Sequence, residues 1–147
     1  MKVILTTLLL LLTTLQYAQD YSIEYNQLLN RIEIRDRYGR EIGHAKYNEL
    51  LNRLEYYDPC GRLDKTEQYN PLLERTEIND PYGNNIGYEK RNSLLNRTER
   101  YDPYGNLEYS KQYNNLIDRT EVNDPYGNRI GSYEYNDLLD RTEYYGY

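Results

Sequence analysis

Residues 69–90 read YNPLLERTEINDPYGNNIGYEK, and this 22-residue unit decides the fold because it recurs along the chain. The copies span residues 25–46, 47–68, 69–90, 91–112, 113–134 and, in part, 135–147. A period of this length is typical of arrays whose units are stable only when packed on their neighbours. We therefore expect residues 19–147 to form a single repeat domain.

The segment Asp-Pro-Tyr-Gly-Asn at residues 80–84 predicts a tight turn. Pro presets φ at the second turn position, Asp accepts hydrogen bonds from the backbone that follows, and Gly adopts a left-handed conformation. Before the turn, Thr76 and Ile78 alternate with Arg75 and Glu77, which is the period of a half-buried strand. A second strand should follow the turn, so each copy predicts an antiparallel β-hairpin and the chain an all-β fold.

The Asn-x-Leu-Leu-x stretch should connect one hairpin to the next, and we expect its paired leucines to plug the end of the core. A helical interpretation competes here. Tyr47, Leu50, Leu51 and Leu54 have helical spacing, and Asn48 is a suitable N-cap. Helix-turn-strand repeats therefore stand as the alternative fold.

Alternate copies differ, which doubles the true unit to 44 residues. The first, third and fifth copies carry Ile-Gly after the turn, as at Ile86-Gly87, whereas the second and fourth carry Leu63 and Leu107 one place earlier. Residues 20–24 resemble a second strand, and the chain ends after a first strand, so each end supplies half a hairpin. Those halves could pair and close a ring. Three such units make a small ring, so we expect an elongated or twisted array.

The first eighteen residues have the pattern of a secretory signal peptide. Lys2 is positively charged, Val3 to Leu15 is largely apolar, and Ala18 is a small residue at the expected cleavage point. The apolar stretch is shorter than the ~20 residues that a membrane span needs. We expect cleavage after residue 18, no membrane span in the remaining chain, and a secreted, cell-surface or periplasmic protein.

The amino-acid composition limits the classes of partner that we expect. The formal net charge is −6, and loss of Lys2 with the signal leaves 17 basic against 24 acidic residues, or −7. An acidic chain without a basic stripe repels phosphate backbones, so nucleic acid is not an expected partner. The chain has 20 Tyr and no Phe or Trp.

Cys60 is the sole cysteine, so no internal disulfide forms, and we interpret it as a tolerated turn substitution.

Residues 57–63 and 101–107, which share Tyr-Asp-Pro-x-Gly-x-Leu, resemble the Tyr-Asp repeats of bacterial Rhs-type secreted proteins. In that family, long arrays build β shells around toxin cargo or mediate surface contacts. Five and a half copies are too few to enclose a domain, so the resemblance implies local hairpin structure and a bacterial source.

No catalytic constellation recurs. His44 is the single histidine and should be a solvated surface residue, and no nucleophile is paired with a base. We therefore expect neither enzymatic activity nor a cofactor. The Arg-x-Glu element found in all six copies, as at Arg97 and Glu99, should form a surface ladder of pairs across neighbouring strands.

The turn tips are the candidate binding site. Their aromatic rings could stack on sugars or peptides as a row of weak, multivalent contacts, unless each ring covers its own turn. The candidates are Tyr38, Tyr82, Tyr104 and Tyr126, with Asn84, Asn106 and Asn128 beside them. A weaker alternative is calcium bound at Asp80, Asp102 and Asp124.

From these features we expect an exported, non-enzymatic module for binding or scaffolding at the cell exterior, with a glycan, cell-wall polymer or protein as partner. The alternative is an assembly protein that pairs with a partner chain through exposed strand edges at residues 20–24 and 141–147. The sequence leaves the oligomeric state open.

Overall fold

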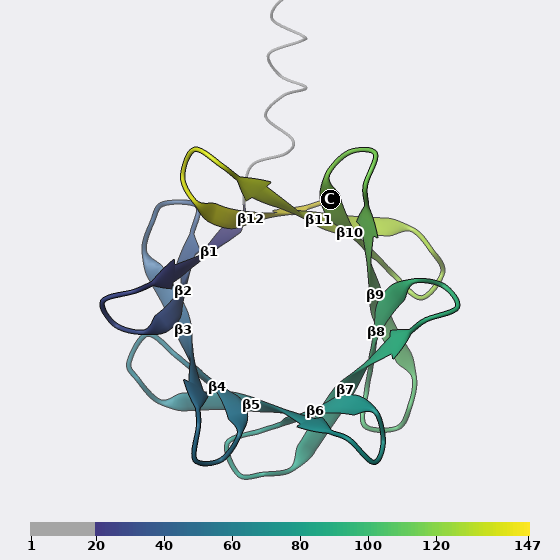
Figure 1. Cartoon of the computed structure of the whole chain (residues 1–147), viewed down its shortest axis with the longest axis horizontal. Coiled ribbons are helices and arrows are strands. Elements are labelled where there is room, and N and C mark those ends of the chain that lie inside the picture. Colours follow the sequence, from purple (N-terminus) through teal and green to yellow (C-terminus); the bar gives the residue numbers. More distant parts are fainter. Residues whose placement is uncertain (1–19) are drawn as a thin grey trace, which may run out of the picture.

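A computed structural model describes residues 20–147, which form one antiparallel sheet of twelve strands closed into a ring (Figure 1). The strands are β1 (Tyr21–Asn26), β2 (Arg31–Asp36), β3 (Glu41–Asn48), β4 (Arg53–Tyr57), β5 (Leu63–Asn70), β6 (Arg75–Asn79), β7 (Asn85–Asn92), β8 (Arg97–Tyr101), β9 (Leu107–Asn114), β10 (Arg119–Asn123), β11 (Arg129–Asn136) and β12 (Arg141–Gly146). This part of the chain contains no helix. The all-β prediction is confirmed, and the helix-turn-strand alternative is wrong. The predicted signal peptide, residues 1–18, lies outside the described residues.

The predicted elongated or twisted array is wrong, because β1 pairs with β12 and closes the sheet. The seam between them has the register of a repeat hairpin. Glu99 lies opposite Ser110 within the fourth copy, and Glu143 lies opposite Ser22 across the seam in the same way. Three 44-residue units therefore complete the ring. Each unit supplies four strands, and twelve strands exceed the eight whose side chains just fill a barrel, so the ring is not sterically small.

The Asp-Pro-Tyr-Gly-Asn turns form as predicted at one end of the barrel. In the third copy the Gly83 amide donates to the Asp80 carbonyl at 3.0 Å, and Gly83 is left-handed with φ 88°. A register shift after Ile78 marks the accompanying bulge. Because successive strands are antiparallel, the five turns of this kind within residues 20–147 all lie at the same end of the ring.

The Leu-Leu connections lie at the opposite end and are four-residue loops. Asn70 bends one of them by accepting hydrogen bonds from the backbone amides of Leu72 and Leu73, at 3.1 and 3.2 Å. Left-handed Glu74 then returns the chain to β6. The prediction that the leucines plug the core is wrong. The inward positions are already taken by strand residues such as Thr76, so the loop continues past the barrel end and Leu72 is 93% exposed.

The outer face carries the Arg-x-Glu pairs, and in all six copies the two residues contact each other within one strand. Arg97, for example, contacts Glu99 at 2.6 Å, because residues i and i+2 share one face of a strand. The predicted pairs across neighbouring strands form in some copies only, as between Arg119 and Glu134 at 3.3 Å. In the fourth copy the neighbouring strand supplies an amide, since Asn92 Nδ2 donates to Glu99 at 3.1 Å.

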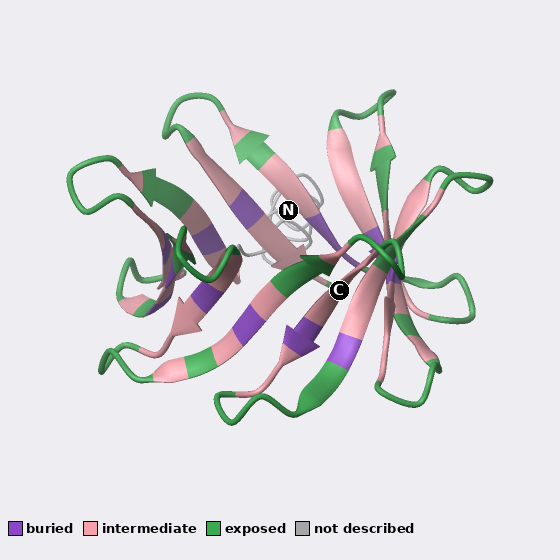
Figure 2. Cartoon of the chain, turned by 60° about the horizontal axis from the view of Figure 1, so that its bottom comes forward, coloured by how far each residue is buried: buried purple, intermediate pink, exposed green. Residues whose placement is uncertain are grey.

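Burial is concentrated at mid-strand, and both barrel ends are exposed (Figure 2). Among residues 20–147 the buried hydrophobic side chains are only Ala45, Ile78 and Val122. The Ile-Gly alternation has a packing cause here. A Cβ on Gly131 would collide with the Tyr144 ring, and one on Gly87 would collide with the Tyr101 carbonyl. Glycine in the odd copies therefore makes room for the strand of the following even copy.

Gly87→Ala should lower the free energy of unfolding by about 2–3 kcal/mol, because φ is 138° and the added methyl group meets the backbone of β8. Gly83→Ala is the matched control. Gly83 also has positive φ but nothing within 4 Å of its Cβ, so about 1 kcal/mol is expected from strain alone. Urea denaturation of both variants measures the difference, and equal losses would contradict the packing account.

Candidate functional site

The sequence-predicted tyrosines lie at the tips of the turns and point into solvent. Tyr82, Tyr104 and Tyr126 are 90–91% exposed, and Tyr38 is 77% exposed with Arg40 over its ring at 5.5 Å. The alternative that each ring covers its own turn is therefore wrong. We call these four turn tips, together with the equivalent tip at Cys60, the tyrosine rim.

The predicted Asn and Asp residues are engaged within their own turns. Asp80 accepts hydrogen bonds on Oδ1 from the backbone amides of Tyr82 and Asn84, and on Oδ2 from the Asn84 side chain at 2.7 Å. The Asn84 hydrogen bond is the main reason why the pKa of Asp80 is lowered. Asn106 and Asn128 bond to Asp102 and Asp124 in the same way. The side-chain amides of these asparagines therefore stabilise their own turns and are already used as donors there.

The same contacts bear on the calcium alternative. Both carboxylate oxygens of Asp80 already accept hydrogen bonds, as do those of Asp102 and Asp124. Within the described chain, no three His, Cys, Asp or Glu side chains gather as metal ligands would. The calcium alternative stays a prediction.

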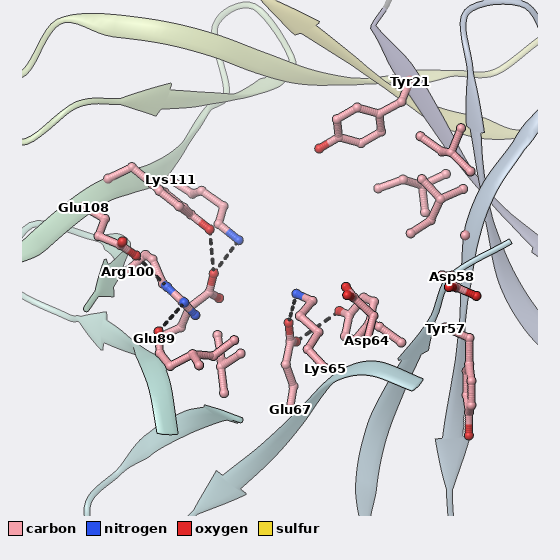
Figure 3. Close-up of a pocket in the computed structure, with 18 of the residues that line it drawn as sticks. Tyr21, Tyr57, Asp58, Asp64, Lys65, Glu67, Glu89, Arg100, Glu108 and Lys111 are labelled. Atoms are coloured by element: carbon pink, nitrogen blue, oxygen red, sulfur yellow. Dashed lines mark hydrogen bonds and ion pairs between the residues drawn. The ribbon is translucent and has the colours of Figure 1, made fainter. Parts of the chain in front are cut away.

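A cavity of about 890 Å³ lies inside the ring and opens beside the tyrosine rim. Its position follows from residues next to those turns, such as Asp58, Asp64 and Glu108, which border it together with inward side chains of the strands. Figure 3 shows lysine, glutamate, arginine and tyrosine side chains projecting into this space. No motif in the sequence predicted this site.

One wall of the cavity is a Tyr–Lys–Glu cluster on β4 and β5. Lys65 Nζ contacts Glu67 at 2.7 Å and lies 4.0 Å from the centre of the Tyr56 ring. The Tyr56 hydroxyl donates to Glu67 at 3.1 Å. Burial raises the pKa of Tyr56, and the negative charge of Glu67 raises it further, so the hydroxyl stays protonated and serves as a donor.

A second cluster stands on β7, β8 and β9. Lys111 Nζ contacts Glu89 at 2.8 Å, and the Tyr109 hydroxyl donates to the same carboxylate at 3.4 Å. Burial is the largest single influence on Lys111 and opposes its charge, but the hydrogen bond to Glu89 and the negative charge of Glu89 together raise its pKa. Arg100 lies close by, paired with Glu108 at 3.0 Å.

The third part of the lining is aromatic and includes the seam. Tyr21 of β1 stacks on Tyr144 of β12 at 4.8 Å between ring centres, and its hydroxyl is 2.8 Å from that of Tyr133. Burial is the main cause of the raised pKa of Tyr21. The cavity thus presents three different walls: two with charge pairs and one with stacked tyrosines.

A pattern in the even copies could have revealed this lining. Tyr56 and Arg100 occupy the inward position that Ile34, Ile78 and Val122 fill in the odd copies. Polar residues at strand positions that should point into the barrel indicate that the interior is not a filled apolar core. The 44-residue alternation predicted the hairpin unit but not this difference between the inward residues of odd and even copies.

The single cysteine and the single histidine of the sequence lie outside the cavity lining. Cys60 is exposed at a turn tip. His44 is half-buried, in contrast to the predicted solvated position, because its ring stacks on Tyr57 at 5.2 Å and its Nδ1 lies 3.1 Å from Glu41.

No family model and no curated protein matches this chain. A crystal structure of an Arabidopsis thaliana protein is similar, with a TM-score of 0.65 over 89% of this chain and 81% of that chain, at 11% identity. At this identity the likeness concerns the fold alone. The resemblance to Tyr-Asp repeats stays a prediction. Among residues 20–147, no helix is long and apolar enough to cross a bilayer.

Proposed function

We propose that this protein is an exported, non-enzymatic binding module that recognises a glycan or cell-wall polymer at its tyrosine end. The observation that carries the proposal is the placement of exposed tip tyrosines and the mouth of the cavity at the same end of the barrel. Tyrosine rings stack on the apolar faces of sugars, and each contact is weak. Several rings on one rigid scaffold add their contributions.

The cavity offers hydrogen-bond donors and acceptors that would suit the hydroxyl groups at the end of a sugar chain. Lys65 and Lys111 offer donors, Glu67 and Glu89 offer acceptors, and the neighbouring tyrosine hydroxyls can do both. A polyol exchanges its hydrogen bonds with water for bonds to such groups, while an apolar ligand would displace water from these polar side chains and offer no hydrogen bonds in return. The lining therefore favours a sugar over a lipid chain.

The assembly alternative has less support. It requires free strand edges, and within the described residues β1 and β12 pair with each other.

A glycan and cell-wall polymer array tests the proposal with three purified variants beside the parent. Replacing Tyr82, Tyr104 and Tyr126 by Ala should reduce apparent affinity by about a hundredfold when all three rings contact one ligand, because roughly 1 kcal/mol is lost at each ring. The matched control replaces Leu72, Leu94 and Leu116 by Ala at the other end and should bind like the parent. Lys65→Met with Lys111→Met tests the cavity separately.

Loss of binding in the tyrosine variant alone would place recognition on the rim, and loss in the lysine variant would extend it into the cavity. No glycan binding by the folded parent would overturn the proposed function.

A further inference from the structure

The end of the barrel opposite the tyrosine rim carries exposed aliphatic side chains on every loop. We call these twelve residues the leucine rim. They are Leu28, Leu29, Leu50, Leu51, Leu72, Leu73, Leu94, Leu95, Leu116, Ile117, Leu138 and Leu139. The first of each pair is 91–95% exposed, and the second is about half exposed. Leucine repeated at all six tips costs solubility and contributes little to the core, so packing does not explain it.

A layer of aromatic rings lies directly behind the leucines. Tyr25, Tyr47, Tyr69, Tyr113 and Tyr135 are each 52–60% exposed, at the last inward position before the loop. Four of them are held by hydrogen bonds to the residue that ends the loop, as in Tyr25 to Asn30. Exposed aliphatic side chains at the tips, followed by half-exposed tyrosines, have the order in which side chains occur from the acyl region to the headgroups of a membrane.

Charged groups form the next layer. Each of the six strands that leave the loops begins with an arginine paired to a glutamate, as Arg97 is to Glu99. The outer wall of the barrel beyond this layer is therefore polar. An apolar phase would accept the loops but not the wall, which limits the contact to the barrel end.

The charge of the loops distinguishes between partners. Glu49, Glu74, Asp118, Asp137 and Asp140 lie within the six four-residue loops, which contain no Lys or Arg. Anionic lipid would repel this rim, and so would the same rim of a second copy placed face to face. The six loops that carry the leucines are separate from one another around the ring (Figure 1), which suits a deformable surface better than a rigid groove.

We infer that the leucine rim docks the barrel end-on onto the surface of zwitterionic lipid. The outer leucines enter the acyl boundary, the tyrosines lie at headgroup depth, and the tyrosine rim faces away from the lipid. This inference goes beyond the proposed function and does not depend on it. It does orient the proposed glycan site towards the surrounding medium.

Site-specific fluorescence on the whole chain tests the orientation. Cys60, the native cysteine, lies at the tyrosine rim and takes an environment-sensitive dye without further change. In a Cys60→Ser background, Leu50→Cys places the same dye on the leucine rim. With phosphatidylcholine vesicles, the dye at position 50 should shift to the blue and brighten, while the dye at position 60 should not. The first nineteen residues precede β1, which begins at the tyrosine-rim end, so binding through that segment would favour the dye at position 60 and give the opposite result.

A second measurement removes the leucines. Glutamine at positions 28, 50, 72, 94, 116 and 138 should weaken vesicle binding about tenfold or more, since binding scales with the apolar area buried. Tyr82, Tyr104 and Tyr126 changed to Gln are the control at the other end. Vesicles that also contain phosphatidylserine should bind the parent more weakly.

Three results would overturn the inference. These are equal dye responses at both rims, unchanged vesicle binding of a folded leucine variant, and leucine-dependent dimers in sedimentation without vesicles. The last would assign the rim to a second copy. If the glutamine variant fails to fold, the dye comparison still decides.

Discussion

Removal of residues 141–147 is expected to abolish folding. This deletion takes away β12, which is the partner of β11 on one side and of β1 on the other. It exposes two strand edges at once and removes Tyr144, which stacks on Tyr21. Folding free energies of about 5–15 kcal/mol leave no margin for such a loss. Far-ultraviolet circular dichroism and size-exclusion chromatography should show an unfolded or aggregated chain.

A circular permutant is the control, because it keeps all twelve strands while a repeat turn takes the place of Gly146 and Tyr147. Tyr145 can be joined to Asp20 through Asp-Pro-Tyr-Gly-Asn-Leu, the segment that follows Tyr101 in the fourth copy. New ends between Tyr104 and Gly105 fall in an exposed turn. The seam has the register of an even-copy hairpin, so the permutant should fold with an unfolding free energy within about 1 kcal/mol of the parent. An unfolded permutant would show that the seam is not equivalent to the other hairpins.

The sequence predicted local structure well because each turn is encoded within a few residues. Asp80, Pro81 and Gly83 specify a turn without help from distant contacts, and period-two alternation around Ile78 specifies the strand before it. Closure of the ring depends instead on the angle between neighbouring strands. This angle is small, and its sum over twelve strands decides whether β1 and β12 meet. Half-hairpins at the two ends suggested a ring, but no single residue sets that angle.

The leucines and the cavity were missed for a related reason. Leu72 and Leu73 were assigned to the core because leucine is usually buried, and that rule fails where a loop runs past the end of a barrel. Lys65 and Lys111 were not considered as site residues because an interior wide enough for solvent was not expected. Both errors follow from assuming a filled core, and a ring of twelve strands does not provide one.

Changing Glu55, Glu99 and Glu143 together to Gln is expected to lower the free energy of unfolding at pH 7 by about 5 kcal/mol. All three are buried on the outer face, once in each 44-residue unit. Each carboxylate accepts from an arginine and from a tyrosine hydroxyl, as Glu99 does from Arg97 and Tyr101. Charge-assisted hydrogen bonds contribute about 1.5–3 kcal/mol each, and glutamine keeps only part of them.

The same substitution should flatten the acid side of the stability curve. Burial alone would raise the pKa of Glu99 and Glu143, but hydrogen bonds from tyrosine and arginine outweigh it and lower both values. For Glu55 the Tyr57 hydroxyl is the largest cause of the lowered pKa. A carboxyl whose pKa is lower in the folded state stabilises the protein above its unfolded pKa of about 4.3, and that stability is lost as the pH falls further.

The parent should therefore lose stability steeply below about pH 4, and the triple variant should lose much less over the same range. Glu24→Gln, Glu49→Gln and Glu74→Gln, at three exposed positions, form the control set with the same change in net charge. Urea denaturation from pH 7 to pH 3 measures all three proteins. If the exposed set flattened the acid curve as much as the buried set, overall charge would be the cause. A difference between the sets would instead show that the Glu–Arg–Tyr clusters on the outer wall hold this thinly packed barrel together.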